Sequence, residues 1–329
     1  MKKLINGAAD VVPQALRGLA LAHREILSVH ENPAYVTRAQ RKPGKVALVS
    51  GGGSGHEPLH AGFVGHGMLD AACPGHVFTS PTPDQIAAAA EAAESGKGVL
   101  FIVKNYSGDV MNFEMAAEMF RHPNATVIVQ DDVAVESSTY STSRRGVAGT
   151  LVVEKIVGAA AEAGADLAAC AALGERVARA CGTMGVALTS CTVPAAGKPT
   201  FALEEEEMEL GVGIHGEPGR RRVPMAPAAA IADELVGAIV RDLAPRRGEA
   251  LLLLLNGFGG TPLLELYIMF DAAARRLAAD GFTIARSLVG NFVTSLEMAG
   301  CSITLARLDD ELIELWDAPV QTAALRWGR

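Results

Sequence analysis

The sequence predicts an α/β protein in which a doubly wound N-terminal domain, with a mostly parallel sheet, is followed by a second, α+β domain. Short apolar runs at residues 46–50, 99–104 and 126–130 alternate with alanine-rich segments of helical pattern. The runs are apolar almost throughout, which is typical of parallel strands that helices cover on both faces. With 329 residues, 49% of them hydrophobic, the chain can form two cores.

The elements of the first domain, residues 1–181, follow from these patterns in order. The strand over 46–50 breaks into the glycine-rich segment 51–58. A helix is expected over 83–94, where Thr82 can cap the first turn and Asp84 carries a charge that suits a helix N-terminus. Strands over 99–104 and 126–130 come next, and helices over 147–163 and 167–180 complete the domain.

The second domain, residues 182–329, has a different pattern. A strand is expected over 186–192, and a rigid proline-containing loop follows at 194–199. The acidic run 204–207 is interpreted as solvated surface rather than as a metal site. A second glycine-containing loop, 214–219, follows the run 208–213. Further strands are expected over 251–255, 286–289 and 302–307, with a helix that begins near Thr261 and Pro262.

Composition excludes several classes of protein. The net charge is −8 and no basic block is present, which argues against a nucleic-acid partner. The apolar runs are too short to cross a membrane, and no apolar stretch follows the N-terminal lysines as in a signal peptide. The cysteines lie far apart, without C-x-x-C spacing, as reduced thiols do in a cytoplasm. We therefore expect a soluble, acidic, cytoplasmic protein. The cysteines are Cys73, Cys170, Cys181, Cys191 and Cys301.

The segment GGGSGHEP at 51–58 is the most informative motif, because it places bare backbone N–H groups at the C-terminal edge of a sheet. It is not a P-loop, which needs Lys and Ser/Thr after its last glycine. It is not the dinucleotide fingerprint either, which needs glycine where His56 or Pro58 stands. The segment favours a loop that holds a small polar ligand beside an imidazole. The alternative is a tight strand-to-helix turn without a ligand.

Polar residues follow each of the three strands of the first domain. If the strands are neighbours, these residues converge on one site. The adjacent carboxylates Asp131 and Asp132 invite a magnesium interpretation, but neighbouring side chains on a loop usually point in opposite directions, so we expect no metal there. The converging residues are Ser54 and His56, then Asn105 and Asp109, then Asp131 and Asp132.

Only two of the eight histidines, His56 and His215, lie in glycine-rich loops, where a backbone can approach a ligand and present one side chain. A neutral imidazole is a usable nucleophile or base near pH 7. The alternative for His215 is a turn histidine that binds a neighbouring carbonyl. Structural or surface roles are expected for the others, which are His23, His30, His60, His66, His76 and His122.

Two further residues are candidates at the end of the second strand. Asp109 can accept a proton from a substrate hydroxyl, and its alternative is the N-cap of a helix over 110–119. Lys104 can neutralise a phosphate or anchor a hydroxyl, and its alternative is a strand-end lysine in solvent.

A set of motifs along the chain resembles the substrate-binding subunit, subunit K, of dihydroxyacetone kinases. In order these are GGGSGHEP, ACPGHVFTSPTPDQI, KNYSGDVMNFE, DDVAV, RRGVAG, CTVPAAGKP, GVGIHGEPG and LWDAP. The resemblance implies that His215 binds the ketone carbon of dihydroxyacetone covalently as a hemiaminal. It also implies that the subunit is a homodimer with a doubly wound N-terminal domain. The positions implied to bind the triose and activate its hydroxyl are Gly53, Ser54, Gly55, His56, Lys104 and Asp109.

The resemblance also concerns cofactors and partners. It implies that this chain binds no cofactor or metal, and that ADP or ATP with Mg²⁺ is held by a nucleotide-binding subunit L. The phosphoryl donor is either a phosphotransferase-system protein or ATP. The sequence departs from the family pattern in a short Arg/Pro/Ala-rich stretch between Gly219 and Ala250, and at Phe258. Three questions stay open: whether Asp109 or His56 is the main base, whether a longer ketose such as erythrulose is the substrate, and whether the chain is a non-catalytic ketose sensor.

Overall fold

The computed structural model describes residues 2–134, 143–217 and 219–328. Its first sheet has the strand order β1-β2-β5-β3-β6-β7. The central strands β5, β3, β6 and β7 run parallel, and β1 and β2 form an antiparallel edge. The sheet thus has the mostly parallel core that the apolar runs predict. The strands are β1 (Leu27–Glu31), β2 (Ala34–Arg38), β3 (Ala47–Ser54), β5 (Ala71–Val77), β6 (Val99–Lys104) and β7 (Asn124–Val129).

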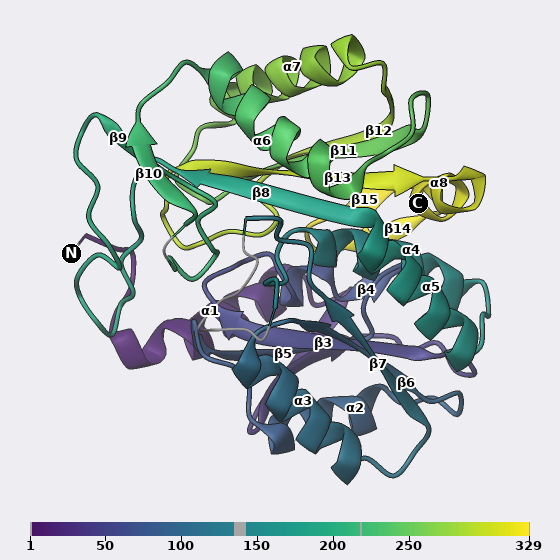
Figure 1. The fold of residues 1–329 in the computed structure, drawn as a ribbon. Coiled ribbons are helices and arrows are strands. Elements are labelled where there is room, and N and C mark those ends of the chain that lie inside the picture. Colours follow the sequence, from purple (N-terminus) through teal and green to yellow (C-terminus); the bar gives the residue numbers. More distant parts are fainter. Residues whose placement is uncertain (1, 135–142, 218, 329) are drawn as a thin grey trace.

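Helices cover both faces of this sheet, which confirms the doubly wound prediction. The helices α2 (Pro83–Ala93) and α3 (Ser107–Met119) pack on one face. The helices α4 (Gly149–Glu162) and α5 (Leu167–Ala180) pack on the other (Figure 1). A capping box at Thr82 and Gln85 begins α2, as the Thr82 signal predicts. The three strands β3, β6 and β7 are neighbours, so their C-terminal ends share one edge.

The second sheet is mixed, as expected of an α+β domain, with the order β10-β9-β8-β13-β11-β12. Its pairs are antiparallel except for β11 with β12. The helices α6 (Ala228–Leu243) and α7 (Leu263–Ala279) cover its outer face (Figure 1). The strands are β8 (Cys181–Ala187), β9 (Glu207–Leu210), β10 (Arg221–Pro224), β11 (Ala250–Gly257), β12 (Thr283–Gly290) and β13 (Gly300–Leu308).

The strand expected over 186–192 is wrong in its position, because β8 ends at Ala187. Its sequence CGTMGVA contains two glycines and little of the β-branched content that marks a strand. Pairing with β13 on one side and β9 on the other holds it in the sheet. The division of the chain between residues 181 and 182 stays a prediction.

The remaining elements pack around these two layers. A small sheet joins β4 (Gly65–His66) to the C-terminal strands β14 (Val320–Thr322) and β15 (Arg326–Trp327), so the end of the chain returns to the first half. The described residues include no helix with the length and apolarity needed to cross a bilayer. The other elements are η1 (Ala8–Asp10), α1 (Val11–Ala22), η2 (Ala61–Phe63) and α8 (Asp310–Asp317).

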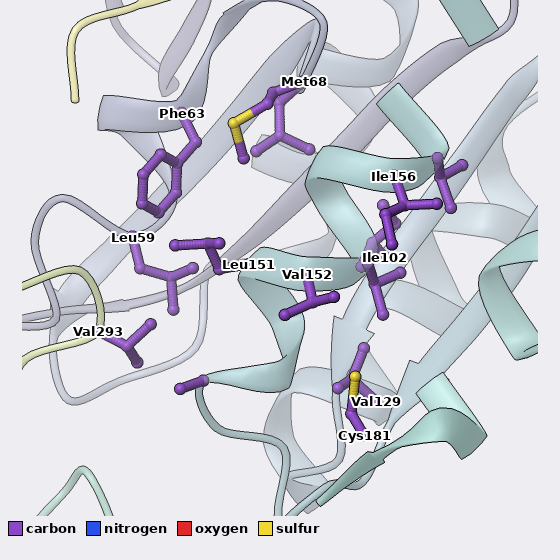
Figure 2. Close-up of a cluster of buried hydrophobic side chains, with 14 of the residues drawn as sticks. Leu59, Phe63, Met68, Ile102, Val129, Leu151, Val152, Ile156, Cys181 and Val293 are labelled. Carbon is purple, nitrogen blue, oxygen red and sulfur yellow. The ribbon is translucent and has the colours of Figure 1, made fainter. Parts of the chain in front are cut away.

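Helix α4 lies between the two sheets and is buried on all its sides. Almost every residue from Gly149 to Ala161 is inaccessible to solvent, as expected of a helix that packs on both sides. Figure 2 shows Leu151, Val152 and Ile156 of this helix among side chains from both halves, including Ile102 and Val293. The largest hydrophobic core of the described residues therefore continues from one sheet to the other.

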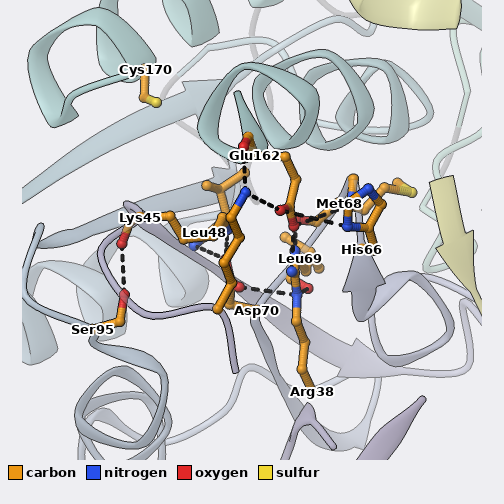
Figure 3. Close-up of polar contacts among 12 residues, drawn as sticks. Arg38, Lys45, Leu48, His66, Met68, Leu69, Asp70, Ser95, Glu162 and Cys170 are labelled. Carbon is orange, nitrogen blue, oxygen red and sulfur yellow. Dashed lines mark hydrogen bonds and ion pairs between the residues drawn. The ribbon is translucent and has the colours of Figure 1, made fainter. Parts of the chain in front are cut away.

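A buried ionic network connects the last residue of α4 to the first sheet (Figure 3). The Arg38 guanidinium contacts Glu162, and its Nε lies 3.0 Å from Asp70 Oδ1. Lys45 Nζ lies 2.5 Å from Asp70 Oδ2, and Lys42 Nζ lies 3.3 Å from Glu162 Oε2. Burial by itself would raise the pKa of Glu162, but the charges of Arg38 and Lys45 lower it to about 2.

We expect Glu162→Gln to lower the free energy of unfolding by roughly 2–3 kcal/mol at pH 7, after allowance for partial solvent screening. Because the folded pKa lies below the usual 4.5, this contribution is complete above pH 4.5 and disappears as the pH falls towards 2. Urea denaturation of both proteins across this range measures the difference. Glu175→Gln, which removes an exposed pair with Arg179, is the control, and an equal loss in the two variants would contradict the expectation.

Candidate functional site

The glycine-rich segment continues strand β3 as far as Ser54 and leaves room for a lysine from the neighbouring strand. A Cβ atom at Gly52 would lie 2.2 Å from Lys104 Nζ. Any side chain at this position would therefore displace the ammonium group. Glycine at position 52 therefore allows the close approach of the Lys104 side chain to the backbone.

Lys104 is the last residue of β6 and is completely buried. Its Nζ donates to Gly51 O at 3.3 Å and to His60 Nε2 at 3.1 Å, and it lies 3.3 Å from Asp109 Oδ2. A solvated strand-end lysine, the alternative drawn from the sequence, is therefore wrong. The ammonium is fixed beside a carboxylate at the edge of the sheet.

Asp109 lies inside the first turn of α3, because the helix begins at Ser107 and its N-cap is Tyr106. The N-cap alternative for Asp109 is therefore wrong as well. The Ser80 hydroxyl donates to Asp109 Oδ1, while Oδ2 faces Lys104. The carboxylate is almost completely buried, yet it forms part of a cavity wall.

His56 is buried and has one free ring nitrogen. Nδ1 lies 2.8 Å from Thr294 O, and because a carbonyl oxygen can only accept, Nδ1 carries the proton. Nε2 has no hydrogen-bond partner in residues 2–134, 143–217 and 219–328. Burial, with the nearby charges of His215 and Lys104, lowers the pKa of His56 well below its usual value. The ring is therefore a neutral hydrogen-bond acceptor at Nε2.

His215 follows β9, in a loop from the second half of the chain. Its backbone N–H donates to Glu217 Oε2 at 3.0 Å, and its Nδ1 lies 3.0 Å from Glu217 Oε1. Gly216 permits this turn because its φ is +74°, and a Cβ there would lie 2.4 Å from Thr200 Oγ1. The turn-histidine alternative named a carbonyl as partner, whereas the ring binds a carboxylate. Pro218 of the same motif lies outside the described residues.

Glu217 fixes the tautomer of the His215 ring. Burial would raise the pKa of Glu217, but His215 and Arg145 together lower it to about 2. An ionised carboxylate accepts the Nδ1 proton, so in the neutral ring the lone pair of His215 lies on Nε2. That atom has no hydrogen bond to the described part of the chain, which leaves it available as a nucleophile.

Arg145 joins this loop to the first half of the chain. Its Nε donates to Asp132 Oδ2 at 2.8 Å, and its Nη2 donates to Gly211 O at 2.8 Å. Its Nη1 lies 4.0 Å from Glu217 Oε2. Asp132 follows β7, so three charged side chains, Asp132, Arg145 and Glu217, connect the first sheet to His215. The position of the His215 ring is therefore determined by both halves.

Asp109, His215 and Glu217 line a cavity of about 450 Å³. The rings of His56 and His215 meet edge to face with their centres 4.6 Å apart, and Tyr106 lies edge to face with His215 at 4.4 Å. Phe78 stacks on His56 at 5.1 Å. The walls therefore combine aromatic rings with a few polar groups. They are formed by Gly53, Phe78, Ser80, Tyr106, Gly108, Asp109, Thr200, His215, Gly216 and Glu217.

Not every predicted site residue points into this cavity. Gly53 contributes to the wall, but Ser54 Oγ donates to Gly75 O at 2.7 Å and Gly55 N–H donates to the Glu57 carboxylate. Lys104 lies behind Asp109 rather than on the wall. His56 is also absent from the wall, and it contacts the ring of His215 from the buried side. A larger cavity of 690 Å³ lies on the other side of the glycine-rich segment, against α1, and its walls are mainly apolar.

The adjacent carboxylates after β7 have structural partners. Asp131 accepts from the backbone N–H groups of Val147 and Gly149 at the start of α4 and from the Thr183 hydroxyl. Asp132 pairs with Arg145. Within the described ranges, His, Cys, Asp and Glu side chains form no group of three or more that could hold a metal ion.

Sequence reasoning did not find Glu217, Arg145 or Ser80. Arg145 carried a usable signal, because a cation before a helix N-terminus is unfavourable unless an anion holds it. Glu217 lies two residues from His215, which is the spacing that allows contact within a tight turn. Ser80 lies in an ordinary loop and gave no signal.

Comparisons with known proteins agree with this geometry. The Dak1 domain model matches residues 17–324. The chain is 48% identical to the dihydroxyacetone-binding subunit DhaK of the PEP-dependent dihydroxyacetone kinase of Escherichia coli K12, over the whole of both chains. It is 50% identical to the dihydroxyacetone-binding subunit DhaK of PTS-dependent dihydroxyacetone kinase 1 of Listeria innocua, over 98% of this chain and all of that one.

A solved structure is also similar. The dihydroxyacetone kinase operon co-activator DhaQ superimposes with a TM-score of 0.88 at 34% identity, over 94% of this chain and 96% of that one.

Proposed function

This chain belongs to the Dak1 family, and from that membership we propose that it is the dihydroxyacetone-binding subunit of a dihydroxyacetone kinase, a phosphotransferase with an alcohol as acceptor. The observation that carries the proposal is one cavity lined by an imidazole, His215, and a carboxylate, Asp109, with the second imidazole of His56 in edge-to-face contact with the first. Each of these groups has a different task in the phosphorylation of a small hydroxyketone.

His215 is the anchor. Its Nε2 lone pair adds to the ketone carbon, the π electrons of the carbonyl move to its oxygen, and that oxygen takes a proton. The ring gains a positive charge in this step and loses it when Nδ1 gives up its proton, so the hemiaminal is neutral. Glu217, ionised beside Nδ1, stabilises the charged ring on the way. The covalent bond fixes the hydroxymethyl groups of the ketose in the cavity.

Asp109 is the proton acceptor for the hydroxyl that is phosphorylated. It lies on the cavity wall, and Ser80 and Lys104 hold its two oxygens. His56 accepts a hydrogen bond from the substrate through its free Nε2. We assign the larger share of the proton transfer to Asp109, because its carboxylate lies on the cavity wall and the His56 ring does not.

The phosphoryl donor is a nucleotide on a separate subunit. The names of two relatives describe a binding subunit of a PEP-dependent or a PTS-dependent kinase, which supports a phosphotransferase-system protein as the ultimate donor. Phosphoryl transfer is mainly a matter of positioning and charge stabilisation. In this scheme the chain positions the acceptor oxygen, and its partner holds the nucleotide and Mg²⁺. We further propose that the chain acts as a homodimer.

We expect the purified chain to bind dihydroxyacetone but to transfer no phosphate alone. Activity should appear when a nucleotide-binding subunit L from a related kinase is added with its phosphoryl donor. A coupled assay for dihydroxyacetone phosphate, with erythrulose as a second acceptor, measures this. ATP-dependent phosphorylation by the isolated chain would contradict the two-subunit scheme. A clear preference for erythrulose would identify the longer ketose, rather than dihydroxyacetone, as the substrate.

The similarity to an operon co-activator supports a second candidate, a ketose sensor. A sensor needs the anchor but no proton acceptor. The Asp109–Lys104 pair on the same cavity favours the kinase subunit, because a buried ion pair beside the bound hydroxyl has no task in sensing. A reconstituted system that binds dihydroxyacetone without phosphorylating it would favour the sensor.

A further inference from the structure

A chain of buried groups continues from Asp109 away from the cavity. Beyond Lys104 it reaches His60, whose Nε2 lies 3.1 Å from Nζ. It then reaches Glu154 of α4, whose Oε1 lies 2.6 Å from His60 Nδ1. His60 is 5% exposed and Glu154 is inaccessible. The mechanism described above uses neither residue, and both are polar groups whose burial needs a reason.

The hydrogen-bond directions in this chain are determined by Lys104. An ammonium group has three donors and no acceptor, and Nζ has three neighbours, namely Gly51 O, His60 Nε2 and Asp109 Oδ2. His60 Nε2 must therefore be an acceptor, so the proton of the neutral ring lies on Nδ1. Burial, together with the charges of Lys104 and His56, lowers the pKa of His60 well below its usual value, which keeps the ring neutral.

Glu154 and Ser50 hold this tautomer. The Ser50 hydroxyl donates to Ile102 O at 2.6 Å, so its oxygen can only accept from His60 Nδ1, 3.0 Å away. Glu154 Oε1 accepts the same proton at the shorter distance. Glu154 Oε2 has no partner in the described parts of the chain. Burial raises the pKa of Glu154 to about 8. A proton on Glu154 can stay on Oε2, so Oε1 accepts from His60 in both protonation states.

We propose that His60 and Glu154 are positioning residues for phosphoryl transfer: Glu154 fixes the ring of His60, and His60 aims the Lys104 ammonium at Asp109. This proposal rests on the proposed function, because it assigns a task within that reaction. Without the acceptor at His60, one ammonium proton loses its partner. The side chain can then turn away from Asp109, whose charge is no longer held at the cavity wall.

The activity test uses His60→Leu in the kinase assembled with its nucleotide-binding subunit. We expect kcat to fall by about 10–100-fold, the usual effect of removing a group that orients a functional side chain. Covalent capture of dihydroxyacetone at His215 should persist. Glu154→Leu should also lower kcat. Glu154→Gln keeps an acceptor oxygen and should therefore retain most of the wild-type activity. Unchanged kcat in His60→Leu and Glu154→Leu would overturn the proposal.

Two comparisons separate positioning from general damage. In the Asp109→Asn background, His60→Leu should lower kcat no further, because the group that it serves is already lost. A second loss of the same size would assign His60 a separate or merely structural role. Thr150→Val is the matched control, since Thr150 lies one turn before Glu154, is equally buried and has no partner for its hydroxyl in the described residues. Its kcat should equal that of the wild type.

A spectroscopic test does not depend on activity. The ¹⁵N chemical shifts of the His60 ring in the wild-type chain should report a protonated Nδ1 and an unprotonated Nε2. In Glu154→Leu these two chemical shifts should change, because the acceptor that holds the Nδ1 proton is lost. The opposite tautomer in the wild type would overturn the proposal even if the kinase works. The assembled wild-type protein could instead show the expected tautomer but no phosphoryl transfer. That result would contradict the proposed function and leave the hydrogen bonds of His60 as described.

Discussion

His215→Asn is expected to abolish covalent binding of dihydroxyacetone and to lower kcat of the assembled kinase by at least about 10²-fold. An amide nitrogen has no lone pair that can add to a ketone, whereas the imidazole Nε2 does. The aromatic contacts of His215 with His56 and Tyr106 are also lost, but these shape the cavity and form no bond to the ketose. In ¹³C NMR of dihydroxyacetone labelled at its ketone carbon, the wild type should convert the carbonyl signal to that of a tetrahedral carbon.

Two controls accompany this measurement. His122→Asn changes an exposed histidine paired with Glu91 and should leave the adduct intact. Glycerol has the same hydroxymethyl groups but no electrophilic carbon, so it should be a far poorer ligand and substrate than dihydroxyacetone. If the wild type binds the ketose only through hydrogen bonds, or if it phosphorylates glycerol as fast, the covalent anchor is wrong.

Asp109→Asn is expected to lower kcat by about 10²–10⁴-fold while the ketose still binds. The amide keeps the shape of the side chain and an oxygen that can accept from Ser80 or Lys104, but it cannot take a proton from the substrate hydroxyl. The separation between binding and turnover is the decisive observation. Steady-state kinetics of the assembled kinase and NMR of the adduct measure the two quantities on the same protein.

A matched variant tests whether charge or proton transfer is responsible. Ser80→Ala removes the hydrogen bond to Asp109 Oδ1 and leaves the carboxylate in place. Its effect on kcat should be much smaller than that of Asp109→Asn. An unchanged kcat in Asp109→Asn would move the role of proton acceptor to His56, whose Nε2 is free for it.

The elements that could be predicted from the sequence are those whose residues carry a local signal. The strands β3, β6 and β7 are runs of apolar residues that end at glycine or polar residues, and α2 has a complete capping box. Strand β5, with the sequence AACPGHV, has proline and glycine inside it and gave no such signal. Strand β3 pairs with it over most of its length, so tertiary pairing determines this strand more than its own residues do.

The same distinction applies to the cavity. His56, Asp109 and His215 could be found because each stands in a glycine-rich or strand-end context that a ligand explains. Their roles stay predictions. The local signals at Arg145 and Glu217 did not suffice to find them, because the contact between these two residues joins segments far apart in the sequence. The alternatives for Lys104 and Asp109 were open in the sequence and are excluded by burial and by the start of α3.

Helix α4 has a consequence for how the protein can change over evolutionary time. Because one side of the helix packs on the first sheet and the other on the second, a larger or smaller residue on it must be accommodated by two layers at once. A Cβ at Gly158, for example, would lie 2.5 Å from Gly67 O. Substitutions that adapt the cavity to another ketose are therefore more easily tolerated in the loops that carry Phe78, Thr200 and His215 than in the helix that supports them.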